Sequence, residues 1–213
     1  MNNPIGTGKF ITVEGSEGVG KTTNITFIKE WFENQGIDYI CTREPGGTPM
    51  AEQIRELLLQ PRKEKVNQEA ELLLVFAARA QHLDRVVKPA LAAGKWVLCD
   101  RFTDATYAYQ GGGREMNSST IASLENLVQG QLRPDAVLLL DIDVTLGLER
   151  ARTRGELDRF EQEDIQFFER VRAAYLERAR DNTSYHVIDA SQGLDEVQQR
   201  VAQVLEKLQQ RLA

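Results

Sequence analysis

The sequence predicts an α/β protein built on a five-stranded parallel sheet with helices on both of its faces. The first observation behind this prediction is that short apolar, β-rich segments alternate with helical patterns along the 213 residues. Such alternation is typical of parallel strands joined by right-handed helical crossovers. The second is that each distinctive motif follows the end of a predicted strand, where ligands bind in sheets of this kind. We expect one domain over residues 1–213, with a short arginine-rich lid at about residues 150–163.

The first part of the chain is predicted to contain two strands and two helices. Gly36 is expected to end the first helix, because glycine readily adopts the left-handed backbone that closes a helix. Pro45, Gly46 and Gly47 break any regular element, so a loop follows the second strand. Thr48 is expected to cap the second helix, with proline in its first turn. The predicted strands are residues 10–14 and 38–42, and the predicted helices are residues 21–35 and 49–59.

A long helix is predicted from Asn67 to His82, with a bend before Pro89. Its middle, residues 70–80, is apolar almost all round, and a helix of this kind must be covered on more than one side. One side would meet the sheet. The other is either covered within the same chain or forms a contact between two copies, and we favour a homodimer joined through residues 67–82.

Three strands and five helices are predicted in the remainder of the chain. Residues 136–140 are continuously apolar, as suits a strand covered on both faces of a parallel sheet. The three glycines at residues 111–113 are expected to end a short helix, because glycine is a poor helix former. The last helix repeats apolar residues at three- and four-residue steps. The strands are residues 95–100, 136–141 and 184–188, and the helices are residues 102–109, 119–129, 144–152, 164–180 and 194–208.

Residues 15–22 fit the pattern G-x-x-x-x-G-K-[ST] at each fixed position. A strand precedes them and a helix follows, which is the context of a phosphate-binding loop and of the P-loop NTPase fold. Glycines let backbone N–H groups surround phosphate oxygens, and the helix N-terminus adds partial positive charge. Lys21 would reach the β- and γ-phosphates of ATP, and Thr22 would bind Mg²⁺. The predicted ATP contacts are Gly15, Ser16, Glu17, Gly18, Val19, Gly20, Lys21, Thr22, Thr23 and Arg150.

The composition argues against several classes of protein. The net charge of −6 disfavours a nucleic-acid-binding surface. No apolar run approaches a membrane span, and residues 1–8 lack the charged and apolar regions of a secretory signal. Cys41 and Cys99 lie in apolar runs and are expected to be buried strand thiols, while His82 and His186 are too few for a zinc site. We therefore expect a cytoplasmic protein with no nucleic-acid or membrane partner.

Four charged residues lie at predicted strand ends. Asp100 could hold Mg²⁺ directly or through water, and Asp141 competes for this role. We favour Asp100, because Arg101 beside it offers a phosphate contact and keeps the carboxylate ionised. Arg43 precedes the Pro-Gly-Gly loop, where its guanidinium could bind phosphate oxygens through two hydrogen bonds. The alternatives are a strand-end ion pair for Asp100 and Arg101 and a solvated loop residue for Arg43.

Three further groups have both a functional and a structural interpretation. Glu17 lies in the glycine loop, where phosphate would repel it, so we expect it to face a hydroxyl of a second substrate. Phe76 and Arg79 share a helix face and could stack on a base and donate to its carbonyl, although a core phenylalanine beside a surface arginine is the usual arrangement. The arginines at 150, 152, 154 and 159 form either a solvated face or a lid that delivers positive charge to a transferring phosphoryl group.

Taken together, these residues resemble one family, the bacterial thymidylate kinases. The matching motifs are GSEGVGKTT at residues 15–23, TREPGGT at 42–48, FAAR at 76–79, DRF at 100–102, AYQGGG at 108–113 and RARTRGELDRFEQE at 150–163. They span nearly the whole chain in the family's order. The glycine loop by itself indicates only an ATP- or GTP-binding protein, whereas TREPGGT together with DR and RGELDR is highly specific.

The resemblance implies that a homodimer transfers a phosphoryl group from ATP to dTMP, with Mg²⁺ as cofactor. It implies dTMP contacts by Glu17 to the 3′-hydroxyl, Arg43 and Arg101 to the 5′-phosphate, Phe76 and Arg79 to thymine, Tyr109 to the sugar, and Gln110 near the base. It also implies that Arg154 meets the transferred phosphoryl group. The catalytic residues would be Lys21, Arg154, Asp100 and Arg101, and the metal contacts would be Thr22 and Asp100.

One residue departs from the family, and other classes of protein remain open. Ala105 stands where the family usually has serine, so Thr106 or Gln110 would have to satisfy the base at that point. A GTPase would be expected to carry N-K-x-D for guanine, and no such tetrad occurs in the sequence. A kinase of another small acceptor would not need TREPGGT. A nucleotide sensor that signals through the long helix would not need Lys21, Thr22 and Asp100.

Overall fold

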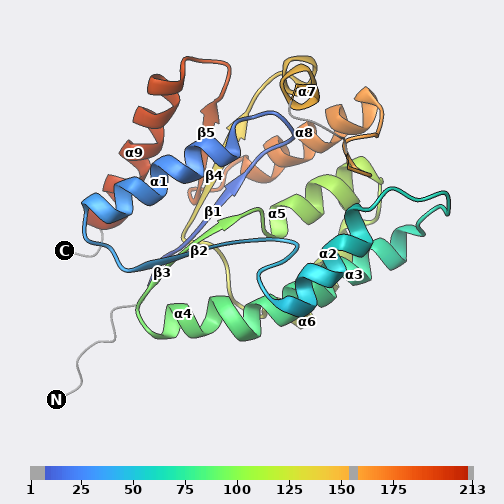
Figure 1. The fold of residues 1–213 in the computed structure, drawn as a ribbon, viewed down its shortest axis with the longest axis horizontal. Helices are drawn as coiled ribbons and strands as arrows, with labels where there is room; N and C mark the ends of the chain where they lie inside the picture. The colour runs from blue at the N-terminus through green and yellow to red at the C-terminus, as the bar shows by residue number, and fades with distance from the viewer. Residues whose placement is uncertain (1–7, 154–157, 211–213) are drawn as a thin grey trace.

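The computed structural model describes residues 8–153 and 158–210. Its centre is a five-stranded sheet in the order β2-β3-β1-β4-β5, in which each pair of neighbours runs parallel (Figure 1). The strands are β1 (Phe10–Glu14), β2 (Tyr39–Arg43), β3 (Trp96–Asp100), β4 (Ala136–Asp141) and β5 (Tyr185–Asp189). The predicted fold class is therefore confirmed.

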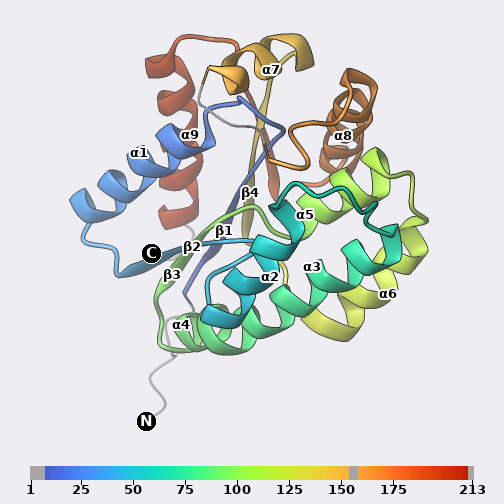
Figure 2. The same ribbon diagram turned by 45° about the vertical axis from the view of Figure 1, so that its right-hand side comes forward.

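Helices cover both faces of this sheet. In the described residues they are α1 (Lys21–Asn34), α2 (Pro49–Leu59), α3 (Gln68–His82), α4 (Lys88–Ala92), α5 (Thr103–Thr106), α6 (Ser118–Gln129), α7 (Val144–Arg152), α8 (Ile165–Ala179) and α9 (Leu194–Gln210), with π-helical segments η1 (Leu83–Val87) and η2 (Tyr107–Gly113). On one face, Ile28 and Phe32 of α1 share an apolar cluster with Val201 and Leu205 of α9. Helices α3, α4, α5, α6 and α8 lie on the other side of the sheet (Figures 1 and 2).

The burial of the strands follows their place in the sheet. All five residues of β1 are buried, and so are the first five of β4, which explains their continuous apolar sequences. On the edge strand β2, side chains are half-buried or exposed. Cys41 on β2 is exposed, so the prediction of a buried thiol is wrong there, because an edge strand has a neighbour on one side only. Cys99 on the inner strand β3 is buried, as predicted.

The long helix extends further than predicted. α3 continues through η1 into α4, since Leu83 and Lys88 at the two junctions keep right-handed helical backbone angles. The bend that we expected before Pro89 takes the form of a π-helical turn, η1. Proline has no N–H to donate and its ring crowds the carbonyl four residues earlier, so a wider turn at this point accommodates it.

The glycines at residues 111–113 end a helical segment, as predicted, but they lie within its last turn and not after residue 109. They form the last part of η2, which packs against α8. A Cβ atom on Gly112 would lie 2.7 Å from the carbonyl oxygen of Arg170, and one on Gly113 would lie 2.4 Å from the ring of Phe167. Glycine is needed here so that two helices can approach closely.

α3 is covered on two sides within the chain. Val75 and Ala78 pack against the apolar side of α2, and Leu72 and Phe76 pack with Ile121 of α6. A third side carries Leu73, which is 56% exposed, so the chain alone does not bury the whole apolar surface of this helix. Within the described part of the chain, no helix combines the length and the apolar character needed to cross a membrane.

Candidate active site

A cavity of about 500 Å³ opens beyond the carboxyl ends of β1, β2 and β3. This is where a parallel sheet is expected to bind its ligands. Its wall combines the glycine loop with the α2, α3 and η2 side of the molecule, so it joins a phosphate-binding end to a more apolar end. The lining residues are 17–23, Glu44, Pro45, Arg55, Leu58, Leu59, Val75, Arg79, 100–102, Ala105, Thr106, Tyr109, Gln110, Arg150, Asp158, Phe160 and Glu161.

The backbone of the glycine loop requires its glycines. Gly15, Gly18 and Gly20 have φ angles of 138°, 71° and 88°. Residues with a side chain rarely adopt such angles. A Cβ atom on Gly18 would also lie 1.8 Å from the carbonyl oxygen of Gly147, so α7 could not pack against the loop. The backbone of the glycine loop therefore has the conformation that the sequence motif predicts.

Lys21 is held at the cavity by the loop itself. Its Nζ donates to the carbonyl oxygens of Gly15 at 3.1 Å and Ser16 at 3.0 Å. Burial lowers the pKa of Lys21 to about 8, Arg101 acts in the same direction, and Glu17 and Asp100 offset part of the effect. Eight of the ten predicted ATP contacts line the cavity; Gly15 and Ser16 do not, and contribute by holding the lysine.

Thr22 and Asp100 offer oxygen ligands suitable for a hard cation, and both line the cavity. The Oδ1 atom of Asp100 is buried and has no hydrogen-bond partner among the described residues. A buried oxygen without a partner is unfavourable, and a bound cation would satisfy it. Asp141, the competing candidate, instead accepts two hydrogen bonds from Arg172 at 2.7 and 2.8 Å. The geometry therefore favours Asp100.

The described residues contain no group of three or more histidine, cysteine, aspartate or glutamate residues that could hold a metal ion. One carboxylate and one hydroxyl fit Mg²⁺ bound mainly through phosphate oxygens and water, because Mg²⁺ keeps several waters and needs few protein ligands.

Arg101 pairs with the glycine loop and not with Asp100. Its Nη1 donates to the carbonyl oxygen of Gly15 at 2.8 Å, and its Nη2 donates to Oε1 of Glu17 at 2.7 Å. The hydroxyl of Tyr109 donates to the same Glu17 oxygen at 2.8 Å. Because Arg101, Tyr109 and Glu17 all line the cavity, they form one polar cluster beside the loop.

Glu14 holds residues next to this cluster in place through hydrogen bonds. It was not predicted to belong to the site. Burial and the nearby carboxylate of Asp104 raise the pKa of Glu14 to about 8. Its Oε1 accepts a hydrogen bond from the N–H of Phe102 at 2.6 Å, and its Oε2 accepts one from the hydroxyl of Tyr175 at 3.0 Å. It thereby fixes the backbone after Arg101, whose φ of 65° is unusual for a residue with a side chain.

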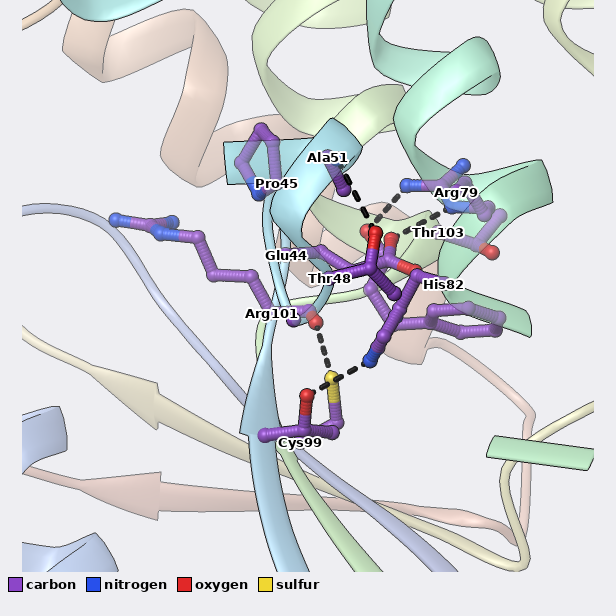
Figure 3. A network of polar contacts seen from close by, with 12 residues as sticks. Glu44, Pro45, Thr48, Ala51, Arg79, His82, Cys99, Arg101 and Thr103 are labelled. Atoms are coloured by element: carbon purple, nitrogen blue, oxygen red, sulfur yellow. Dashed lines mark hydrogen bonds and ion pairs between the residues drawn. The ribbon is translucent and has the colours of Figure 1, made fainter. Parts of the chain in front are cut away.

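Arg79 is a buried cation at the other end of the cavity (Figure 3). Its Nε donates to Oε2 of Glu44 at 2.7 Å. Its Nη2 donates to the carbonyl oxygen of Phe102 at 3.1 Å and to the hydroxyl of Thr106 at 2.9 Å. Nη1 is buried and has no hydrogen-bond partner among the described residues. As far as the structure describes the chain, Nη1 is therefore the one nitrogen of this guanidinium left for a further acceptor, although almost none of its surface is exposed.

Phe76 is not among the residues that line the cavity, and its stacking on a base stays a prediction. Its side chain is 2% exposed and packs with Leu72 and Ile121, with the guanidinium of Arg79 4.8 Å from its ring centre. Val75, one residue earlier on α3, lines the cavity instead. α3 is apolar on nearly all sides, so the sequence did not show which of the two neighbours faces the ligand.

Arg43 likewise does not line the cavity. Its guanidinium forms two hydrogen bonds of 2.8 Å with Glu52 of α2, and the side chain faces a neighbouring groove. Arg55, which sequence analysis missed, lines the cavity and donates to the carbonyl oxygen of Pro45 at 3.1 Å. Burial and the charge of Arg43 lower the pKa of Arg55. No motif in the sequence marks Arg55, so only the folded chain shows that it lines the cavity.

The wall near Ala105 is completed by two polar residues. Thr106 accepts the hydrogen bond from Arg79 described above, and Gln110 donates from Nε2 to Oε1 of Glu71 at 2.9 Å. An ionised carboxylate can only accept, so Gln110 turns its amide NH₂ towards Glu71. Its carbonyl oxygen is the end that remains for a ligand.

The predicted lid is described only in part. Arg154 lies outside the described residues. Arg150 lines the cavity and donates to the carbonyl oxygen of Ala190 at 3.1 Å. Arg159 donates from Nε to the carbonyl oxygen of Leu58 at 2.7 Å and forms an ion pair of 2.7 Å with Glu71. Asp158, Phe160 and Glu161 line the cavity, whereas Arg159 does not.

Comparisons with known proteins agree with this geometry. A family model described as thymidylate kinase matches residues 13–201. A thymidylate kinase from Teredinibacter turnerae is 62% identical over 201 residues, which cover 94% of this chain and 98% of the relative. A thymidylate kinase from Ectopseudomonas mendocina is 59% identical over 203 residues, covering 95% of this chain and 97% of the relative.

Proposed function

This chain belongs to the thymidylate kinase family, and on that premise we propose that it transfers the γ-phosphoryl group of ATP to the 5′-phosphate of dTMP, giving ADP and dTDP. The observation that carries this proposal is one cavity that has the glycine loop at one end and, at the other, Arg79, whose Nη1 has no hydrogen-bond partner among the described residues. A loop that binds a triphosphate and a pocket that recognises a base are what a nucleoside monophosphate kinase needs side by side.

At the donor end, the loop N–H groups and Lys21 hold the phosphates of ATP. Thr22 and Asp100 would hold Mg²⁺, which would supply positive charge to offset the negative charge of the phosphates. Arg150 contacts the donor nucleotide from α7. The charge that develops on the transferred phosphoryl group is met by Lys21 and, as the resemblance implies, by Arg154.

At the acceptor end, Arg101 and Arg55 supply positive charge for the 5′-phosphate of dTMP. Glu17 contacts the 3′-hydroxyl, and Tyr109 packs against the sugar and disfavours a 2′-hydroxyl. We assign to Arg55 the role that the resemblance gave to Arg43, because Arg55 lines the cavity and Arg43 is bound to Glu52. The 5′-phosphate of dTMP thus lies between the donor end and the acceptor end of the cavity.

The thymine base lies against Val75, with Arg79 donating from Nη1 to its 4-carbonyl. Gln110 offers its carbonyl oxygen to the N3–H group of the base. This arrangement answers the question that Ala105 raises, because it satisfies N3 without the serine hydroxyl found elsewhere in the family.

The enzyme acts as a homodimer in this proposal, joined through the open side of α3. Leu73 on α3 and Leu127 on the neighbouring α6 are 56% and 79% exposed. Pairing two copies through this side would bury both. A cytoplasmic location and the absence of a nucleic-acid partner remain predictions.

The test is the release of ADP, followed by a coupled assay, when dTMP is added to the enzyme with ATP and Mg²⁺. We expect ADP release to depend on dTMP. Release at the same rate without any nucleoside monophosphate would contradict the proposal.

A further inference from the structure

His82 makes two contacts that the mechanism above does not use. Its Nδ1 lies 2.9 Å from Oε1 of Glu44, and its Nε2 lies 2.7 Å from the hydroxyl oxygen of Thr42. The ring is fully buried at the end of α3, below the loop that follows β2 (Figure 3). Glu44 is the same carboxylate that holds Arg79, so His82, Glu44 and Arg79 form one chain of contacts that ends at the cavity.

We propose that His82 is a positioning residue for recognition of the acceptor base: through Glu44 it fixes the guanidinium of Arg79 so that Nη1 points at the 4-carbonyl of thymine. The inference rests on the proposed function, and it adds a residue that touches neither substrate. It also gives a reason for a buried histidine beside Glu44 and Arg79, whose charges already balance each other.

The protons in this chain follow from its partners. An ionised Glu44 can only accept, so Nδ1 of His82 is the protonated nitrogen that donates to Oε1. In a neutral ring, Nε2 would then accept from the hydroxyl of Thr42, which lies 2.7 Å away. Both carboxylate oxygens are thereby occupied, Oε1 by His82 and Oε2 by Arg79. A carboxylate held at both oxygens has one orientation, and the guanidinium bound to it has one as well.

The orientation of Arg79 depends on Glu44, because the other hydrogen bonds of the guanidinium are made by Nη2 alone. The side chain is 1% exposed, and Glu44 is 4% exposed, so neither group can be reoriented by water. Nη2 is bound to Phe102 and Thr106, and Nη1 alone has no partner in the described part of the chain. Rotation of the Glu44 carboxylate would move Nη1 away from the base, and a small misplacement of such a group lowers reaction rates markedly.

The loop after β2 is shaped to accept the histidine ring. Gly47 has a φ of 86°, and a Cβ atom there would lie 2.5 Å from Cδ2 and 2.7 Å from Nε2 of His82. The same atom would lie 2.7 Å from the hydroxyl oxygen of Thr42. The second glycine of the TREPGGT motif is therefore needed for the ring to reach both Thr42 and Glu44.

The experiment compares three variants of His82 with the wild-type enzyme, using dTMP and dCMP as acceptors. His82→Asn places an amide donor where Nδ1 lies, His82→Gln places one where Nε2 lies, and His82→Leu keeps only apolar bulk. His186→Asn serves as the control, since His186 lies on β5 and does not line the cavity. For each protein we would measure kcat and KM for dTMP, dCMP and ATP, and the temperature of unfolding.

We expect His82→Gln and His82→Leu to lower kcat/KM for dTMP by roughly 10-fold to 100-fold. The preference for dTMP over dCMP should fall by a similar factor, because a misplaced Arg79 donor no longer distinguishes the two bases. KM for ATP should not change, and His82→Asn should retain most of the preference. A purely structural role would lower the unfolding temperature and leave the preference as it is.

Equal preference in folded His82→Gln and wild-type enzyme would overturn the proposal, as would equal loss of preference in His82→Asn and His82→Gln. If His82→Leu does not fold, the comparison of Asn with Gln still decides the question. A wild-type enzyme that does not phosphorylate dTMP, or does not prefer it to dCMP, would instead refute the proposed function.

Discussion

Arg101 donates a hydrogen bond of 2.7 Å to Glu17, although the two residues are separated by 84 positions in the sequence. Glu17 lies inside a loop that binds phosphate, where a free carboxylate would repel the ligand. The guanidinium of Arg101 and the hydroxyl of Tyr109 both donate to Oε1 of this carboxylate. In the proposed function, the pair would link the donor loop to the acceptor site.

The first prediction concerns the contact of Glu17 with the substrate. Glu17→Ala should lower kcat/KM for dTMP by roughly 10-fold to 100-fold, the usual effect of losing a hydrogen bond to a charged group. Removal of the 3′-hydroxyl from dTMP should have a similar effect on the wild-type enzyme and little effect on the variant. Steady-state kinetics with both substrates and both enzymes completes this double-mutant cycle. If the two losses simply multiply, Glu17 does not touch the 3′-hydroxyl.

The second prediction concerns the proton of Lys21. Its pKa of about 8 in the free protein lies below the ordinary value, so the ammonium is charged below that pH and loses its charge above it. The value of kcat/KM for ATP should therefore fall as the pH rises through about 8, because a neutral amine cannot hold phosphate. Bound phosphates favour the charged form, so kcat at saturating ATP should fall only at higher pH.

Lys21→Ala is the control for this profile. It should lower kcat roughly a thousandfold or more, since positioned positive charge at the phosphates contributes several kcal/mol to the barrier. Binding of dTMP, measured by calorimetry, should stay close to that of the wild type. Residual activity above about a tenth of the wild-type rate would contradict the role of this lysine.

The glycine loop was predictable because its signal is local. Gly15, Gly18 and Gly20 have the positive φ angles that the motif implies, and Lys21 follows at the position expected from the spacing alone. The alternation of strands and helices was also visible, since inner strands such as β4 are apolar along their length. Thr48 caps α2 as predicted, and Asn67, where the long helix was predicted to begin, caps α3.

The lining of the acceptor end was harder to predict, because it depends on how helices are rotated and paired. Contact of Phe76 and Arg43 with dTMP stays a prediction. Phe76 and Val75 are adjacent on a helix that is apolar nearly all round, so periodicity could not choose between them. Arg43 is withdrawn from the cavity by Glu52, a partner that only the folded chain brings to it. Glu14, His82 and Arg55 carry no motif of their own, and their roles appear only through contacts between distant segments.

The third prediction concerns Arg154, which the resemblance places at the transferred phosphoryl group. Arg154→Ala should lower kcat by roughly 10³-fold to 10⁵-fold, as for arginines that act in related phosphoryl transfers. The affinity for dTMP should change little, because the contact forms fully only in the transition state. Arg154→Lys should restore part of the activity, since a single point charge does not reproduce the guanidinium.

Arg152→Ala is a matched control, because Arg152 belongs to the same basic segment and is exposed. It should affect KM for ATP more than kcat. An Arg154→Ala enzyme with near-normal kcat would show that the catalytic cation lies elsewhere.

The fourth prediction concerns the dimer. Leu73→Glu should give a folded monomer, because Leu73 is 56% exposed and a charge there disturbs only the contact between copies. Val75→Glu should unfold the protein or abolish dTMP binding, because Val75 is 9% exposed and packs in the core between α2 and α3. Light scattering at micromolar concentration and thermal unfolding separate these outcomes. A wild-type monomer under these conditions would refute the proposed interface.

The most direct measurement is the rate of ADP release with a panel of nucleoside monophosphates as acceptors. The account predicts turnover of dTMP. Turnover of dUMP, which lacks only a methyl group, should be roughly 10-fold to 100-fold slower. Turnover of dCMP should be much slower still, because its 4-amino group leaves the buried Arg79 donor unpaired. The 6-amino group of dAMP would leave this donor unpaired in the same way, so dAMP should also react much more slowly than dTMP. Equal turnover of dTMP, dCMP and dAMP would contradict the account.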